Sequence, residues 1–247
     1  TQSSGQPEDL VRQRTSAPGS LAKVLTAAAA LESKVDTTIP PMRTYQVTGG
    51  KFDALHSVPC GGKLGEAMAQ SCNPYFAALG AEVGGTRLAQ LTDGWLNAQM
   101  KIDGLPIAQS HLVRAETLSP YMVSAGAIGL GDAQVTSLGM VGVLGMVARG
   151  GDPVCLHLLA GSRSACPDQR GMSKETASAV SDAMRQVVRE GTAKSVSGLT
   201  QMDAAAKTGT ADLPGFTNAT FGAFAPASHP RVAVVVFINS KTPAGGA

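Results

Sequence analysis

Long apolar runs are missing from this chain of 247 residues. A helix that crosses a membrane needs about 18 or more consecutive apolar residues, and no such stretch occurs. The longest candidate, from Met122 to Val147, is interrupted by Asp132 and Gln134. Residues 1–18 also lack the charged start and the apolar run of a signal peptide. The sequence therefore predicts no membrane span, and it fits either a cytosolic protein or one whose leader or anchor lies outside these residues.

Aromatic residues and excess charge are also scarce. Phe, Trp and Tyr make up 4% of the residues and hydrophobic residues 43%, so a core has to be filled mainly by Ala, Val, Leu and Met. The 20 Lys and Arg residues nearly balance the 18 Asp and Glu residues, and no basic run stands out. This balance disfavours nucleic acid as a partner. The length suits one large catalytic domain spanning residues 1–247.

The four cysteines show no spacing typical of a metal site. Cys60, Cys72, Cys155 and Cys166 form no C-x-x-C pair and have no nearby histidine at a zinc-ligand spacing. We therefore expect neither a metal nor a cofactor. An even count with short separations is compatible with two disulfides, Cys60–Cys72 and Cys155–Cys166, in an oxidising compartment. Four buried free thiols are the alternative.

The periodicity of the apolar residues predicts a mainly helical first part and a strand-rich end. Helices are expected over residues 21–33, 64–70, 74–83, 86–98, 137–148 and 173–191. The first helix has almost no polar face, which indicates that it is buried. Strands are expected over residues 154–160, 203–211, 219–225 and 231–239, with the last two joined as a hairpin.

This order of elements predicts an α+β fold, in which an antiparallel sheet is flanked by helices. A largely helical subdomain is expected over roughly residues 34–150. The run from Val232 to Ile238 is nearly all β-branched, which suits a central strand of the sheet.

The segment Ser20-Leu21-Ala22-Lys23 is the first motif that can carry chemistry. Residues three apart on a helix lie on one face, so the Ser20 hydroxyl and the Lys23 amine can meet. Burial lowers the pKa of a lysine, and a neutral amine can act as a base. A helix that starts at Ser20 also directs free N–H groups toward a developing oxyanion. Taken alone, such a segment is more often an ordinary helix cap followed by a solvated lysine.

Two more short motifs are each weak in isolation. Ser71-Cys72-Asn73 places a hydroxyl and a carboxamide two residues apart on a turn between predicted helices. In Lys207-Thr208-Gly209-Thr210, alternation along a strand places Lys207 and Gly209 on one face and the two threonines on the other. The lysine and the hydroxyls suit a carboxylate, and Gly209 permits the close approach of a ligand backbone.

Together the three motifs resemble those of penicillin-binding proteins and class A β-lactamases, in the order S-x-x-K, S-x-N, K-T-G. The chain resembles the transpeptidase domain of class B penicillin-binding proteins from about residue 12 to 239, and among these the penicillin-binding protein A type of actinobacteria. The segments that carry the resemblance are Pro18-Gly19-Ser20 with the Ala-rich helix after it, Ala69 to Phe76, Ile128 to Asp132 with Val135-Thr136, Met184 to Ala193, Lys207 to Ala211, and Phe224 to Ala227.

The resemblance implies a D,D-transpeptidase that cross-links peptidoglycan stem peptides by acyl transfer and is acylated by β-lactams. Ser20 would be the nucleophile, Lys23 its general base, Ser71 the proton relay to the leaving amine and Asn73 a hydrogen-bond partner of the substrate amide. Lys207 would support the electrostatics of Ser71 and the substrate. Thr208 and Thr210, which flank Gly209, would hold the substrate carboxylate. The backbone N–H groups of Ser20 and Thr210 would form the oxyanion hole.

The resemblance also implies cell-wall synthesis or division proteins as partners, and an extracytoplasmic location with a membrane anchor outside this chain. Members of the family usually carry one or two strands before the nucleophile helix and a helix after the last strand. We therefore expect the sequence to be trimmed at both ends.

Three other functions have to be weighed against a transpeptidase. A class A β-lactamase needs a Glu and an Asn to activate water, and Glu116 with Thr117-Leu118-Ser119 does not supply that pair. A β-lactam sensor domain would acylate once and signal through segments outside this chain. A Ser-His-Asp hydrolase is disfavoured because G-x-S-x-G is absent and because the histidines lie in ordinary loop or strand contexts, at His56, His111, His157 and His229.

Overall fold

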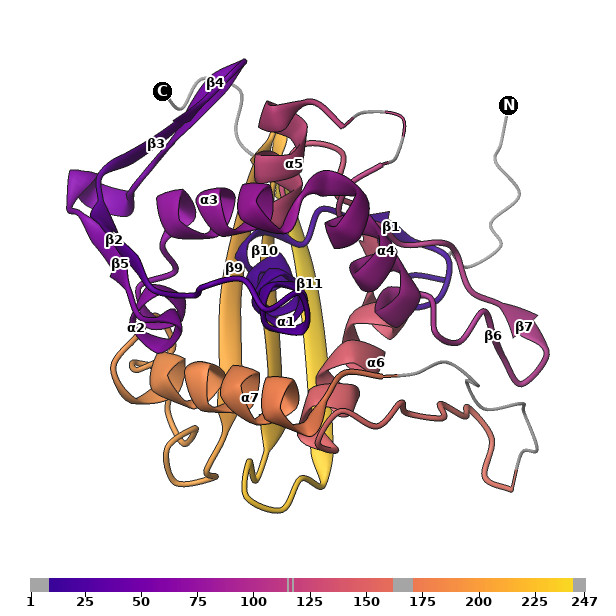
Figure 1. Cartoon of the computed structure of the whole chain (residues 1–247). Helices are drawn as coiled ribbons and strands as arrows, with labels where there is room; N and C mark the ends of the chain where they lie inside the picture. The colour runs from indigo at the N-terminus through magenta and orange to yellow at the C-terminus, as the bar shows by residue number, and fades with distance from the viewer. Residues whose placement is uncertain (1–8, 115, 117, 162–170, 242–247) are drawn as a thin grey trace.

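The computed structural model describes residues 9–114, 116, 118–161 and 171–241. Its most buried α-helix within these ranges is the first, α1 (Lys23–Glu32), which follows a 3-10 turn, η1 (Gly19–Ala22). Every residue from Lys23 to Ala30 is buried, as the missing polar face predicts. The alanines leave room for close neighbours, and α1 packs against helices on several sides and lies in front of the sheet in Figure 1.

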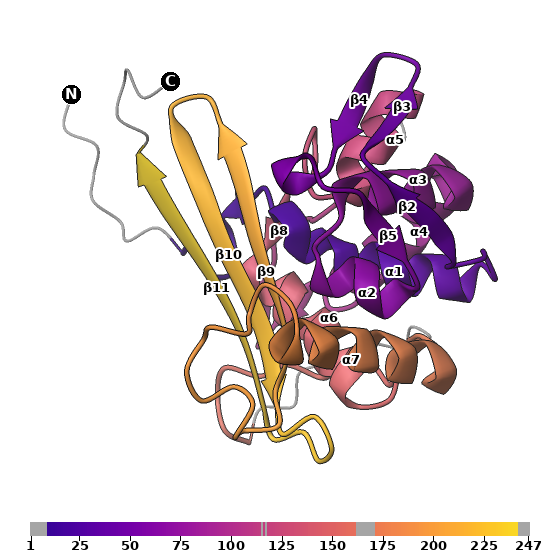
Figure 2. The same cartoon turned by 90° about the vertical axis from the view of Figure 1, so that its left-hand side faces the viewer.

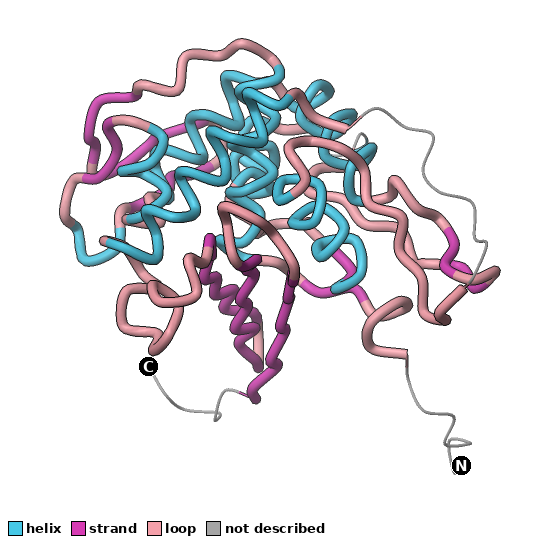
Figure 3. Tube along the Cα trace, turned by 90° about the horizontal axis from the view of Figure 1, so that it is seen from below, coloured by secondary structure: helices cyan, strands magenta, loops and turns pink. Residues whose placement is uncertain are grey.

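The main sheet has three long antiparallel strands in the order β11-β10-β9 within the described residues. They are β9 (Ala205–Leu213), β10 (Phe216–Ala225) and β11 (Val232–Lys241), and both connections are hairpins. The β10–β11 hairpin confirms the one that the sequence predicts. Figure 2 shows the helices packed on one face of these strands, and Figure 3 shows the same separation from below.

The prediction of a central strand over Val232–Ile238 is wrong for the described sheet, because β10 is its middle strand and β11 lies at its edge. Alternate side chains of β11, such as Val235 and Phe237, pack against the core, whereas Val232 and Ile238 are 65% and 59% exposed. A β-branched run shows that both faces of a strand are apolar, but it carries no information on how many strands pair with it.

Six more α-helices lie within the described ranges. They are α2 (Leu64–Ala69), α3 (Asn73–Val83), α4 (Gly85–Leu96), α5 (Pro120–Ala127), α6 (Ser137–Ala148) and α7 (Lys174–Arg189). The helices from α3 to α7 each contact α1 or the main sheet. Five of the six confirm the predicted helices, and α5 was not predicted. Its start is marked by a Ser119 side chain that accepts a hydrogen bond from the Met122 N–H at 3.2 Å, with Pro120 in the first turn. No helix of the described residues is long and apolar enough to cross a membrane.

Short two-stranded sheets connect these helices. They pair β1 (Thr15–Ser16) with β8 (Val135–Thr136), β2 (Ile39–Met42) with β5 (Cys60–Gly62), β3 (Thr44–Val47) with β4 (Gly50–Asp53), and β6 (Lys101–Ile102) with β7 (Leu105–Pro106).

The strand predicted over residues 154–160 does not form. Backbone N–H groups of this segment donate to a side chain and not to a neighbouring strand. The Asp103 carboxylate accepts hydrogen bonds from the N–H groups of Leu158 and Leu159, at 2.7 and 2.8 Å. Both leucines are more than half exposed. Side chains that satisfy the backbone remove the need for a partner strand.

Candidate active site

Ser20 lies in the η1 turn, one turn before α1 begins. The residues at the cap positions of η1 and α1 are Pro18 and Ala22, so Ser20 is not a helix cap, which was the alternative interpretation of this motif. The turn is set by Gly19, whose φ of +52° is a conformation that glycine adopts easily. A Cβ at Gly19 would lie 2.5 Å from the Thr210 carbonyl oxygen, so the missing side chain lets the turn pack against β9.

The Ser20 side chain is half-buried and makes no hydrogen bond with the residues that the structure describes. The predicted Ser20–Lys23 hydrogen bond is therefore not formed in this structure. The Ser20 hydroxyl is left free to meet a ligand.

Lys23 is fully buried and reaches the turn between α2 and α3. Its Nζ lies 2.7 Å from the Ser71 carbonyl oxygen, 2.7 Å from Asn73 Oδ1 and 3.2 Å from Ser71 Oγ. Burial, and secondly the positive charge of Lys207, hold the pKa of Lys23 well below its ordinary value of 10.5. Burial therefore shifts the Lys23 amine toward its neutral form.

Lys207 approaches the same hydroxyl from β9. Its Nζ donates to Ser71 Oγ at 2.9 Å and to the Thr208 carbonyl oxygen at 2.7 Å. Burial lowers the pKa of Lys207 to about 7. The Ser71 hydroxyl therefore lies between two buried lysines, one from α1 and one from β9.

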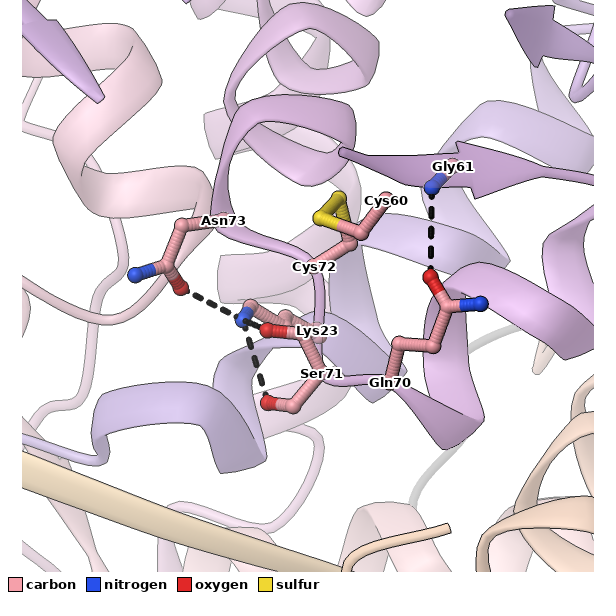
Figure 4. The surroundings of a disulfide bond; sticks show 7 residues. All are labelled: Lys23, Cys60, Gly61, Gln70, Ser71, Cys72 and Asn73. Carbon is pink, nitrogen blue, oxygen red and sulfur yellow. Dashed lines mark hydrogen bonds between the residues drawn. A yellow bond between two sulfur atoms is a disulfide. The ribbon is translucent and has the colours of Figure 1, made fainter. Parts of the chain in front are cut away.

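The turn that carries Ser71 is held by a disulfide. Ser71 has φ of +52°, a left-handed conformation that is uncommon outside glycine. Cys60 in β5 is bonded to Cys72, with a Cα–Cα separation of 5.6 Å, which confirms the predicted pair. Gln70 Oε1 also accepts a hydrogen bond from the Gly61 N–H at 3.3 Å. Figure 4 shows the disulfide and this hydrogen bond next to the Lys23 contacts. Both interactions join the S-x-N turn to β5 and fix its position.

The structure does not test the second predicted disulfide, Cys155–Cys166. Cys166 lies outside the described residues, so this pairing stays a prediction.

Gly209 lines the cleft, and it also packs closely against the nucleophile turn. A Cβ there would lie 2.2 Å from Thr220 Oγ1 and 2.9 Å from both the Leu21 nitrogen and the Pro18 oxygen. The glycine therefore lets β9 pack against the nucleophile turn. The expectation that Gly209 also permits the close approach of a ligand backbone stays a prediction.

A cleft of 440 Å³ brings the three motifs together. Ser20, Ser71, Asn73 and the segment Thr208–Thr210 line it, and Lys23 and Lys207 lie buried beneath it. Apolar side chains of Leu55, Ile128 and Leu130 complete the wall.

Two polar residues of the cleft were not assigned from the sequence. Thr192 Oγ1 lies 2.6 Å from Thr208 Oγ1, and Asp212 follows the K-T-G motif on β9. The segment around Thr192 is among those that carry the family resemblance, which was the available signal. For Asp212, strand alternation from Thr208 was sufficient to place it on the same face.

The histidines whose side chains the structure describes do not line this cleft. His111 accepts a hydrogen bond from Arg114 at 2.9 Å, and His157 lies 3.6 Å from the Asp103 carboxylate. A Ser-His-Asp site at Ser20 therefore has no support among them.

Comparison with known proteins gives consistent matches. Residues 3–247 match the model of the penicillin binding protein transpeptidase domain. The peptidoglycan D,D-transpeptidase PbpA of Mycolicibacterium smegmatis is 30% identical over 250 residues, which is 90% of this chain and 49% of that protein. The PbpA of Mycobacterium tuberculosis is 28% identical, over 90% of this chain and 50% of its own length.

Solved structures agree with this result. Penicillin-binding protein A from M. tuberculosis, as an imipenem acyl-enzyme complex, superimposes with a TM-score of 0.78 at 26% identity, covering 94% of this chain and 57% of that one. Pseudomonas aeruginosa PBP2 gives a TM-score of 0.83 at 26% identity, over 96% and 57%. The chain spans about half the length of the curated relatives that it matches. The chain belongs to the penicillin-binding protein transpeptidase domain family.

Proposed function

We propose that this chain is the catalytic domain of a class B peptidoglycan D,D-transpeptidase, which cross-links stem peptides through a Ser20 acyl-enzyme and is acylated there by β-lactams. The observation that carries the proposal is the Ser71 hydroxyl held between two buried lysines, in a cleft that opens on Ser20. The relatives named above support it, since two are named D,D-transpeptidases and one is an acyl-enzyme with imipenem.

Lys23 is suited to act as the general base for Ser20. A neutral amine has two N–H groups and one lone pair. Two of the contacts of Nζ are the carbonyl oxygens of Ser71 and Asn73, and both can only accept. These contacts use the two N–H groups and leave the lone pair for a hydroxyl proton. As Ser20 Oγ attacks the penultimate D-Ala carbonyl, its proton passes to Lys23.

Ser71 is suited to return a proton to the leaving amine. Its Oγ contacts Lys23 at 3.2 Å and Lys207 at 2.9 Å, so a proton taken from Ser20 can pass through Ser71. The terminal D-Ala then leaves as a neutral amine, and the acyl group stays on Ser20. An amine of a second stem peptide attacks this ester by the reverse sequence of transfers, which regenerates Ser20.

The remaining predicted residues would orient the substrate. Thr208 and Thr210 present hydroxyls along the cleft, and Asn73 can donate from its amide nitrogen while Oδ1 accepts from Lys23. The packing of the η1 turn against β9 supports an oxyanion hole made by the N–H groups of Ser20 and Thr210.

Labelling with benzylpenicillin tests the acylation step. We expect one adduct by intact mass and its location on the Ser20 peptide. Ser20→Ala should abolish the adduct, and Lys23→Ala should slow acylation by about 10²–10⁴-fold because it removes the base. Lys174→Ala is the control, since Lys174 is exposed at the start of α7. An adduct that persists in Ser20→Ala would refute the proposal.

The fate of the ester distinguishes a transpeptidase from a β-lactamase. Hydrolysis needs a base that activates water, and the sequence offers no Glu/Asn pair for it. With a chromogenic β-lactam we expect a burst near one equivalent of enzyme and almost no turnover afterwards. Sustained turnover above about one per second would identify a β-lactamase. A β-lactam sensor would give the same burst but no cross-linked product from stem peptides.

We also propose the wider setting of the domain. Residues 1–247 form one transpeptidase domain with a helical subdomain near residues 34–150, and the whole protein is anchored in the membrane by a segment beyond them. Its substrate lies outside the cytoplasmic membrane, and the Cys60–Cys72 disulfide supports an oxidising compartment. Cell-wall synthesis or division proteins would be its partners.

A further inference from the structure

Asp212 is the one charged side chain among the described residues that line the cleft. It lies on β9, on the same face as Thr208 and Thr210, because alternate residues of a strand point to one side. The three form a row along the cleft, with two hydroxyls followed by a carboxylate.

Ser20 lies beside the middle of this row. The η1 turn packs against Thr210, where a Cβ on Gly19 would nearly touch the carbonyl oxygen. Thr208 lies toward the lysine end, where Thr192 and Lys207 contribute a hydroxyl and an amine. Asp212 lies about 7 Å beyond Thr210, since each residue of an antiparallel strand advances about 3.4 Å.

This arrangement orients a peptide along β9, and the argument rests on the proposed transpeptidase function. The leaving residue of the substrate carries the terminal carboxylate, which suits the hydroxyls and the amine at the Thr208 end. With the scissile carbonyl at Ser20, the acyl part of the peptide extends the other way, toward Asp212. Asp212 therefore faces the segment that stays on the enzyme in the acyl-enzyme.

The Asp212 carboxylate is available to a ligand. Its Oδ1 accepts a hydrogen bond from Thr217 Oγ1 at 2.8 Å, across the β9–β10 pair. It forms no ion pair with any residue that the structure describes. A carboxylate has room for several donors, so the other oxygen can still accept from a ligand.

We propose that Asp212 selects acyl donors that carry a primary ammonium group on the segment before the scissile bond, and that it disfavours a carboxylate at the same place. The attraction is that of an exposed ion pair, which corresponds to about 1.5- to 5-fold in rate. Because the site is open to water, the preference weakens as salt is added.

Three penicillins with one nucleus test this selection. Benzylpenicillin has a neutral side chain, ampicillin adds an ammonium group to the side-chain carbon, and carbenicillin adds a carboxylate to the same carbon. The second-order rate of acylation is measured for each, below the pKa of the ampicillin amine, on the wild-type chain and on Asp212→Asn. The asparagine keeps an oxygen that can accept from Thr217.

Rates are expressed relative to benzylpenicillin on the same variant, which cancels the intrinsic reactivity of the drugs. In Asp212→Asn we expect the ampicillin ratio to fall about 1.5- to 5-fold and the carbenicillin ratio to rise by a similar factor. Asp182→Asn removes the same charge from the exposed face of α7, outside the cleft, and should leave both ratios unchanged. On the wild-type chain alone, added salt should draw the two ratios together.

The outcomes distinguish failure of the Asp212 inference from failure of the proposed function. Ratios that are the same in Asp212→Asn and in the wild-type chain overturn the inference, as does an equal fall of all three rates. Failure of benzylpenicillin to acylate Ser20 overturns the proposed function itself. Wild-type ratios that do not respond to salt also overturn the inference, whether or not the variant folds.

Discussion

The burial of Lys207 should make the stability of this domain depend on pH. Its side chain has no exposed surface, and burial lowers its pKa from 10.5 to about 7. In the unfolded chain the amine keeps its proton up to about pH 10.5. Between these values the unfolded state binds more protons than the folded state, so the free energy of unfolding rises with pH. Below about pH 7 both states are protonated, and the full cost of burying the charge is present.

The size of the effect follows from the two pKa values. A difference of about 3.5 units corresponds to at most about 5 kcal/mol between neutral and alkaline pH. Lys23 acts in the same direction, because its pKa is also lowered by burial. In the pH range where both lysines titrate, the free energy of unfolding of the wild-type chain should therefore rise more steeply with pH than a single group would make it rise.

Urea denaturation of the wild-type chain and of Lys207→Met, from below pH 7 to about pH 10, measures this contribution. Methionine is long enough to fill the space without a charge. It leaves the Ser71 hydroxyl and the Thr208 carbonyl without the Lys207 donor, which adds a cost that is independent of pH. The stability of the variant relative to wild type should be highest near pH 7 and should decline as pH rises. Parallel curves, with one constant difference at every pH, would refute the reasoning.

Three further changes test the architecture of the site. Gly209→Ala should destabilise the fold by about 1–3 kcal/mol and slow β-lactam acylation, because the new Cβ lies 2.9 Å from backbone atoms of the nucleophile turn; wild-type stability by urea denaturation would contradict this. Replacing both Cys60 and Cys72 by Ala should cost about 3 kcal/mol in the chain-entropy model, and wild-type protein after reduction is the matched comparison. Thr192→Val removes the 2.6 Å contact with Thr208 and should slow acylation about two- to tenfold, so an unchanged rate in stopped-flow measurements would exclude a positioning role.

Local signals in the sequence predicted much of the fold. The Ala-rich segment after Ser20 predicted a buried helix, because a helix without a polar face has no side to turn toward water. The two strand-like segments at the C-terminal end and the turn between them at residues 227–230 predicted the β10–β11 hairpin. The short spacing of Cys60 and Cys72 suggested their disulfide. Each of these features depends on neighbours along the chain.

The sequence also indicated most of the residues of the candidate site. The three motifs named the residues that line the cleft or lie beneath it, because their spacing and order resemble one family. The partner of each atom was less predictable. Lys23 bonds to Ser71 and Asn73, although its spacing from Ser20 suggested that residue. That choice depends on where the S-x-N turn lies, about 50 residues further along the chain.

The sequence pattern indicated most of the helices, the last three strands and the residue types that carry the chemistry, but it missed α5 and predicted a strand over residues 154–160 that does not form. Contacts between distant segments place β11 at the edge of the described sheet, bond the backbone of Leu158 and Leu159 to Asp103, and pack Gly209 against the nucleophile turn. Only the tertiary structure brought Thr192 and Asp212 into the cleft. The physical reason is that helix and strand periodicity is set by neighbours a few residues apart. Strand order, burial of a lysine and the lining of a cleft are set by contacts between distant segments.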